Sequence, residues 1–253
     1  MTVVGGILAL AMGFVLGLLG GGGSVLTVPI LIYALHVPVK PAIATSLVVV
    51  GLVAFIGFLT HARQGTVARR VAFVFGPFAV ASAYAGARVA KHVPGQVQLV
   101  LFALISLAGS VMMFRGTVRK LHVPEDAAYD RDIDARTFLL LALEGTGVGF
   151  LTGLIGIGGG FLIVPALVLV AKLPMRLAIG TSLLVITMNA LSGFAGYIGT
   201  VPIDWNLVAW FSGIAAIGSI CGTLISRRVP QRHLRQVFGL LLIGVSLYVL
   251  YRR

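Results

Sequence analysis

Long apolar runs, separated by short polar stretches, dominate this chain. Residues 42–60, 97–114, 178–198 and 236–251 contain no Asp, Glu, Lys or Arg. About 20 helical residues cross the hydrocarbon core of a bilayer, whereas a transmembrane barrel would show short alternating segments. The pattern therefore predicts an all-α fold, a polytopic transmembrane helix bundle.

The chain contains an internal repeat. Residues 13–29 and 149–165 are identical at ten of 17 positions, at an offset of 136. The polar stretch 116–136, which holds five of the seven acidic residues, separates the two copies. We expect a first transmembrane repeat at 1–115, a polar linker at 116–136 and a second transmembrane repeat at 137–253.

Each repeat divides into five apolar segments. They are expected at about 4–19, 24–36, 42–60, 71–87 and 97–114, and at about 138–155, 160–171, 178–197, 206–225 and 236–251. The second segment of each repeat follows a glycine-rich break and is short. Its 13 or so residues span about 20 Å, which predicts a short, tilted or re-entrant helix.

The basic residues predict how the two repeats are oriented. The chain has 19 Lys and Arg residues, and a formal net charge of +12. Counting the first two segments of each repeat as one passage out and back gives inverted repeats and places 14 basic residues on one side and five on the other. Parallel repeats would give ten and nine. Cytoplasmic loops are enriched in Lys and Arg, so we expect inverted repeats in the cytoplasmic membrane, a cytoplasmic linker and no nucleic-acid partner.

The two glycine breaks are the first candidate for a substrate site. They supply the candidate residues Gly22, Gly23, Ser24, Gly158, Gly159 and Gly160. Irregular backbone at membrane depth is tolerated where protein buries it or where it lines a cavity, and the N–H groups that begin the next helix favour an anion. Alternatively, the glycines only allow helices to cross closely, a role that Gly13, Gly17, Gly20, Gly145, Gly149 and Gly153 fit.

Hydroxyl and amide side chains near the start of the third segments are the second candidate. Thr45 and Ser46 in the first repeat correspond to Thr181 and Ser182 in the second, and Asn189 lies two turns after Ser182. They could bind a substrate oxygen. The alternatives are hydroxyls bonded back to their own helix, and an Asn189 amide that joins two helices.

Glu144 is the single acidic residue within an apolar segment. An intramembrane carboxylate is costly and is a functional candidate by default, here for proton coupling. It could instead reach interfacial water. No cluster of Cys and His suggests a metal, and neither a cofactor nor a nucleotide-binding motif is expected.

These residues resemble those of the sulfite exporter TauE/SafE family of membrane transporters. The likeness rests on the pattern G-x-x-x-G-x-x-G-x-G-G-G-x-x-x-x-P at 149–165 and on L-A-I-G-T-S-L at 177–183. The copy in the first repeat, residues 13–29, differs from the second in having Gly21 where the second has Ile157. The resemblance implies movement of small sulfur-containing anions such as sulfite or sulfonates across a bacterial cytoplasmic membrane.

Together, these observations predict a secondary transporter of a small anion, with the substrate bound where the two breaks meet. The expected partners are the bilayer, the anion and a coupling ion, either proton or sodium. The sequence leaves open whether the chain forms a homo-oligomer. The rival interpretations are a passive anion channel, a membrane-embedded enzyme, which would need a catalytic pair, and a structural assembly protein.

Overall fold

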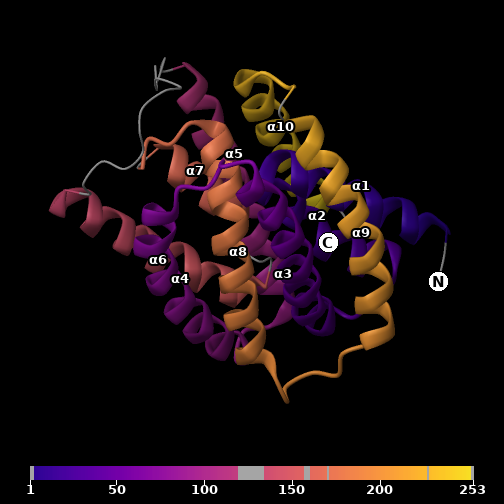
Figure 1. Cartoon of the computed structure of the whole chain (residues 1–253). Helices are drawn as coiled ribbons and strands as arrows, with labels where there is room; N and C mark the ends of the chain where they lie inside the picture. Colours follow the sequence, from indigo (N-terminus) through magenta and orange to yellow (C-terminus); the bar gives the residue numbers. More distant parts are fainter. Residues whose placement is uncertain (1–2, 119–133, 157–159, 170, 227, 252–253) are drawn as a thin grey trace.

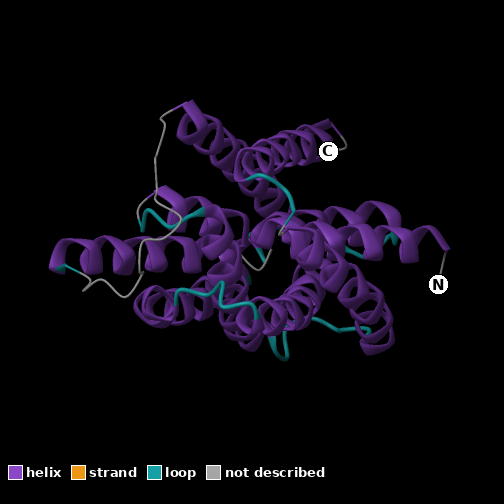
Figure 2. Cartoon of the chain, turned by 45° about the horizontal axis from the view of Figure 1, so that its top comes forward, coloured by secondary structure: helices purple, strands orange, loops and turns teal. Residues whose placement is uncertain are grey.

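A computed structural model describes residues 3–118, 134–156, 160–169, 171–226 and 228–251, which form a bundle of helices without strands in these ranges (Figures 1 and 2). The helices are α1 (Val3–Leu19), η1 (Gly20–Gly23), α2 (Ser24–Pro29), η2 (Ile30–Ala34), α3 (Val39–Arg63), α4 (Arg69–Ala90), α5 (Gly95–Val118), α6 (Ala135–Ile155), α7 (Gly160–Leu169), α8 (Met175–Tyr197), α9 (Trp205–Ser226) and α10 (Gln231–Tyr251). The expected all-α fold is confirmed.

Most of the helices can cross a membrane. Six described stretches are long and apolar enough, namely Val3–Ala34, α3, α4, α6, α8 and α9, and the apolar parts of α5 and α10 are shorter. Large apolar side chains such as Ile7, Leu143 and Leu247 are exposed on the outside of the bundle. Such surfaces belong against lipid, so the chain is a multi-pass membrane protein.

The second segment of each repeat is too short to span the bilayer. In the first repeat, Gly20 has φ of +68°, a conformation that costs glycine little. The chain turns there, so that Gly23 packs against the backbone of Leu16. The helical turns from Ser24 to Ala34 and helix α7 each extend about 15 Å at 1.5 Å per residue, half of a hydrocarbon core of about 30 Å.

The two repeats share unusual backbone geometry at the same offset of 136. Gly156 ends α6 with φ of +75°, as Gly20 ends α1. His36 and Lys172, which follow the short segments, are the non-glycine residues with positive φ in the described chain, at 55° and 51°. The duplication therefore extends from the sequence to the backbone.

Helices α3 and α8 form the centre of the bundle and run in opposite directions (Figure 1). A Cβ atom on Gly57 would lie 3.2 Å from Leu183, and one on Gly193 would lie 3.5 Å from Leu47. Residue numbers therefore fall along α8 as they rise along α3. These two helices are the corresponding third segments of the repeats.

The outer helices cross their neighbours in parallel, through glycines. Gly13 and Gly17 of α1 press on the backbone of Ala215 and Ser219 of α9. In the other repeat, α6 packs in the same way on α4, through Gly145, Gly149 and Gly153. The close-crossing role of these five glycines is thus confirmed. Each first segment packs on the fourth segment of the other repeat, so the halves are interlocked.

These directions place many basic residues at one face of the bundle. Helix α8 runs parallel to α4, because Gly76 lies next to Met188 and the Ser192 hydroxyl donates to the Val80 carbonyl at 2.7 Å. The end of α3 and the starts of α4, α6 and α8 therefore share a face. We call it the basic face; it carries Arg63, Arg69, Arg70, Arg136 and Arg176. At the opposite face, the Lys40 ammonium donates to the Lys91 carbonyl at 3.0 Å.

Candidate functional site

The two glycine breaks meet inside the bundle. A Cβ atom on Gly160 would lie 2.6 Å from the Cα of Gly21, and one on Gly21 would overlap the Gly160 carbonyl group. Both residues are buried. Only glycine at both positions lets the two backbones approach this closely, and the first turn of α7 consequently faces the turn that precedes α2.

Each break also rests on the third segment of the other repeat. A Cβ atom on Gly20 would lie 2.7 Å from the Ser182 hydroxyl of α8. Symmetrically, the Ser46 hydroxyl of α3 donates to the Gly156 carbonyl. The structure thus brings these two predicted serines to the breaks, one from each side.

Both serine hydroxyls also bond within their own helices. Ser46 donates to the Ile43 carbonyl at 2.7 Å, and Ser182 donates to the Ile179 carbonyl at 2.8 Å. This is the local bonding expected of serine in a helix. Either hydroxyl can donate to a ligand only by leaving such a bond.

The remaining residues of the first break differ in what they face. The Ser24 hydroxyl donates to the Gly21 carbonyl at 2.7 Å and lies near Gly160. Gly22 faces Leu19 and Phe238 of α10, not the second break. Of the residues predicted for the second break, Gly160 lies against Gly21. Gly158 and Gly159 lie outside the part of the chain that the structure describes.

The two predicted threonines do not play equal parts. The Thr181 hydroxyl accepts a hydrogen bond from the Ala68 N–H at 2.9 Å, and therefore holds the start of α4 on α8. Thr45 is buried and makes no hydrogen bond to a described residue. The repeated Thr-Ser pair thus has a structural task in the second half that its first-half copy lacks.

Asn189 is the most unusual polar residue of the site. Its side chain is 0% exposed, and neither its amide nitrogen nor its amide oxygen has a partner in the described part of the chain. It lies on the helix face of Ser182 and Ile186, and a Cβ on Gly160 would lie 2.6 Å from Ile186. A buried amide without partners costs about 1–3 kcal/mol, so a bound group with polar atoms would stabilise this position.

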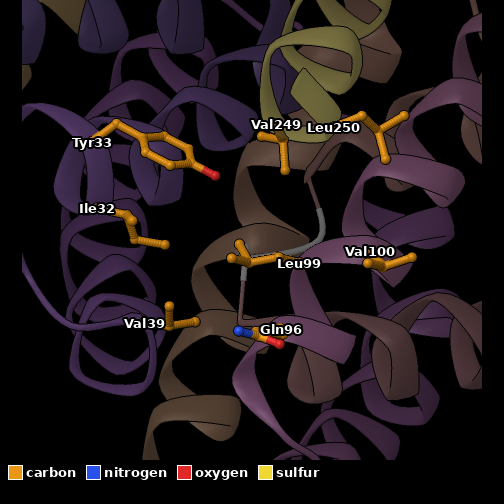
Figure 3. A pocket seen from close by; sticks show the side chains of 8 residues that line it. All are labelled: Ile32, Tyr33, Val39, Gln96, Leu99, Val100, Val249 and Leu250. Atoms are coloured by element: carbon orange, nitrogen blue, oxygen red, sulfur yellow. The ribbon is translucent and has the colours of Figure 1, made fainter. Parts of the chain in front are cut away.

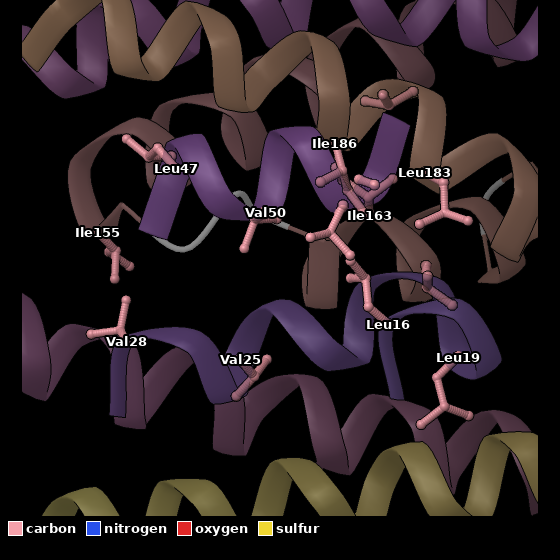
Figure 4. Close-up of a cluster of buried hydrophobic side chains, with 14 of the residues drawn as sticks. Leu16, Leu19, Val25, Val28, Leu47, Val50, Ile155, Ile163, Leu183 and Ile186 are labelled. Carbon is pink, nitrogen blue, oxygen red and sulfur yellow. The ribbon is translucent and has the colours of Figure 1, made fainter. Parts of the chain in front are cut away.

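The layer around the breaks is apolar. Leu16, Ile163 and Ile186, from three different helices, gather there, and Val28 faces Ile155 (Figure 4). No Lys or Arg is among the buried residues that the structure describes. Positive potential at the breaks must therefore come from backbone N–H groups at the starts of the short helices.

Glu144 lies away from the breaks. It is half-buried on α6, its Oε2 is buried without a partner among the described residues, and 11 residues separate it from Ile155, about 16 Å along the helix. The structure therefore keeps the carboxylate and the breaks apart, and a coupling role for Glu144 would act over this distance.

The two described cavities lie elsewhere. One, of about 190 Å³, opens between η2, α5 and α10, where Tyr33, Gln96 and Val249 point into it (Figure 3). The other, of about 290 Å³, lies under the loop between α8 and α9, beside Trp205. Neither cavity is lined by a glycine of the breaks, which are packed shut against each other.

Gly21 is the residue of the meeting point that the sequence patterns did not single out. A signal was present, because the two breaks differ at two positions, Gly21 against Ile157 and Ser24 against Gly160. The glycines at these two differences, Gly21 and Gly160, are the ones whose backbones touch. Gln98, with its amide buried beside the end of α6, had no repeat partner to reveal it.

Comparison with known proteins agrees with this architecture. The family model for the sulfite exporter TauE/SafE matches residues 6–249. A probable membrane transporter protein of Xylella fastidiosa is 36% identical over 249 residues, covering 95% of this chain and 92% of the relative. No solved structure matches the chain.

More distant relatives carry the same description. Probable membrane transporter proteins of Bacillus subtilis and Methanocaldococcus jannaschii are 26% and 29% identical, over 86% and 96% of this chain and 85% and 94% of the relatives. These names describe transporters rather than enzymes. The chain therefore belongs to the sulfite exporter TauE/SafE family and is a membrane transporter.

Proposed function

We propose that this chain is a secondary transporter of small sulfur-containing anions, such as sulfite or organosulfonates, and that the anion binds where the two glycine breaks meet. The observation that carries the proposal is the direct backbone contact between Gly21 and Gly160. It brings the starts of two short helices together in the middle of the bundle. The sulfur-containing substrate class follows from the family's name.

The electrostatics of this junction favour an anion. The amino-terminal end of a helix carries a partial positive charge and unpaired N–H groups. The first turn of α7 faces the turn Gly20–Gly23 that leads into α2, where the Ser24 N–H already donates to the Gly21 carbonyl, and no Lys or Arg is buried among the described residues. An anion that binds when this junction opens would accept backbone hydrogen bonds and offset the repulsion between the two helix ends.

The side chains for such a ligand are already near the junction. Ser24, Ser46 and Ser182 reach the breaks from three helices, and Asn189 offers an amide that has no partner. Amide and hydroxyl donors match the oxygens of a sulfite or sulfonate group. We assign Gly158, Gly159 and Thr45 to the same site from the sequence repeat.

We further propose that the repeats are inverted and that the basic face is cytoplasmic. Support comes from the antiparallel packing of α3 and α8, which are corresponding helices. A two-fold axis that reverses a membrane-spanning helix lies in the membrane plane, the arrangement found in many secondary transporters. The excess of basic residues then falls on the cytoplasmic side.

Transport against a gradient would use an ion gradient, since the sequence carries no nucleotide-binding motif. Proton and sodium are the two candidates, and Glu144 is the proton candidate, because it is the single acidic residue within an apolar segment.

Flux into proteoliposomes tests this function. Purified protein should take up labelled sulfite or a small alkanesulfonate with saturable kinetics. Unlabelled substrate inside the vesicles should accelerate entry, because a carrier exchanges its substrate. Linear flux without counterflow would indicate a passive channel, and the absence of flux with every sulfur anion would refute the substrate class.

A further inference from the structure

The ends of the two central helices carry polar pairs that the proposed site does not use. Tyr197, in the last turn of α8, lies near Gln98 of α5 at the opposite face, and His61, near the end of α3, lies near Thr66 at the basic face. We propose that these pairs are the two gates of the transport path, the Tyr197–Gln98 gate and the His61–Thr66 gate. The inference rests on the proposed site between them.

The Tyr197–Gln98 gate is bonded to the helix that leads into the second break. The Gln98 amide nitrogen donates to the Leu154 carbonyl at 2.7 Å, and the Tyr197 hydroxyl donates to the Gly153 carbonyl at 3.3 Å. Their side chains are 1% and 3% exposed. Helices α5 and α8 are thereby fastened to the end of α6, directly before Gly156.

The Gln98 amide is only half satisfied. Its oxygen is buried and has no partner in the described chain. Such a group is costly in a purely structural contact. It is the arrangement expected of a side chain that exchanges partners when the contact opens.

The His61–Thr66 gate covers the corresponding approach from the basic face. The His61 Nδ1 lies 2.8 Å from the Thr66 hydroxyl, and the imidazole is 2% exposed. A Cβ atom on Gly180 would overlap the Thr66 carbonyl and lie 3.2 Å from His61. The pair therefore lies on the first turns of α8, directly before Thr181 and Ser182.

The two gates occupy the same place in the two repeats. His61 and Tyr197 are separated by the repeat offset of 136, and each is buried near the end of its central helix. Because α3 and α8 are antiparallel, equivalent positions lie at opposite faces. In an inverted-repeat transporter the two halves exchange conformations, so corresponding residues are expected to close the two faces. His61 and Tyr197 occupy such corresponding positions, although one side chain is an imidazole and the other a phenol.

A continuous series of contacts joins the gates through the proposed site. From the basic face it runs from Thr66 to Gly180, and from Ser182 of the same helix to Gly20. Gly21 then meets Gly160, Ser46 bonds to Gly156, and α6 ends under Gln98 and Tyr197. Each gate thus lies between a water-exposed face and one of the two serines.

Cysteine accessibility tests the gates without any transported substrate. The exposed Cys221 is first replaced by serine, and Ser46→Cys or Ser182→Cys then serves as the reporter. A small, charged methanethiosulfonate reagent is added at one face of the vesicles at a time. Tyr197→Ala or His61→Ala opens one gate, and Tyr84→Ala, at an exposed tyrosine of α4, is the matched control.

We expect each gate substitution to change the modification rate of one reporter cysteine from one face only. Tyr197→Ala should raise the modification rate of Ser46→Cys from the opposite face by more than tenfold, because it removes the buried ring as well as a hydrogen bond whose net loss alone can shift an open–closed equilibrium by about tenfold. It should leave Ser182→Cys at the basic face unchanged. His61→Ala should do the reverse, Tyr197→Phe should give a smaller rise, and the control should give none.

Two results would overturn the gates. One is unchanged reporter rates in both variants. The other is an equal rise of both reporters at both faces, which would show general loosening of the bundle. The labelling needs no sulfur anion, so a failed sulfite flux would remove the proposed substrate and leave this result in place.

Discussion

Adding one methyl group at Gly21 is the sharpest perturbation of the site. A Cβ there would overlap the Gly160 carbonyl group and lie 2.7 Å from the Gly160 Cα. The Gly160 carbonyl carbon would lie closer still to this Cβ, whereas ordinary carbon contacts lie at about 3.5–4.0 Å, so Gly21→Ala must drive the two breaks apart by about 1.5–2 Å. Backbone on both sides leaves no flexible side chain to yield.

The neighbouring glycine supplies the matched control. A Cβ on Gly22 would lie 3.1 Å from the Cβ of Leu19 and 3.2 Å from Phe238, so a shift of a few tenths of an ångström relieves the contact. Alanine also gains about 1 kcal/mol over glycine in a helix. Gly22→Ala should therefore leave stability and flux close to wild type.

Overpacking typically costs about 1–3 kcal/mol, which is about a fivefold to 150-fold change in the population of the packed state. We therefore expect Gly21→Ala to lower the initial rate of sulfite uptake by the same factor. Uptake into proteoliposomes, normalised to monodisperse inserted protein, measures it. Equal flux through Gly21→Ala and Gly22→Ala would refute the claim that the junction of the breaks is the site.

Three further predictions concern other parts of the molecule. Cysteines placed at 64–68 or 228–230 in a Cys221→Ser background should be labelled from the cytoplasmic side only, and labelling of 228–230 from outside would contradict the inverted arrangement. Asn189→Val, which copies Val53 of the first repeat, should raise the free energy of unfolding by about 1–3 kcal/mol, because it removes a buried amide without partners. The same substitution should abolish anion transport, and wild-type flux would instead make Asn189 a structural residue. Glu144→Gln should abolish uptake driven by a pH gradient and spare exchange down a substrate gradient, whereas unchanged pH dependence would end the proton-coupling hypothesis.

The sequence predicted most of the helical architecture because apolar runs and glycine breaks are local signals. The expected segment at 71–87 is α4, Arg69–Ala90, and the expected segment at 160–171 is α7, Gly160–Leu169. The first repeat's short segment is more irregular than expected. It continues after Pro29 as a π-helical turn, Ile30–Ala34, whereas α7 stays a regular α-helix beyond the equivalent Pro165.

The site was predicted in part, since its geometry depends on which helices cross. The repeat identified Ser46 and Ser182, and the structure places both against the breaks. The sequence repeat could not show that Thr181 holds the start of α4, that Gly22 faces α10, or that Gly21 is the point of contact. Those facts arise from packing between residues more than 100 positions apart, for which one sequence contains no local signal.

Equilibrium binding tests the central claim most directly. Thermal unfolding of purified protein is measured against increasing sulfite or methanesulfonate, because a ligand at 100 times its Kd stabilises the native state by about 2.7 kcal/mol. We predict stabilisation that rises with the logarithm of the anion concentration for the wild type and for Glu144→Gln, and its loss in Gly21→Ala and Asn189→Val. Equal stabilisation of all four proteins would place the anion away from the junction of the glycine breaks and contradict the account.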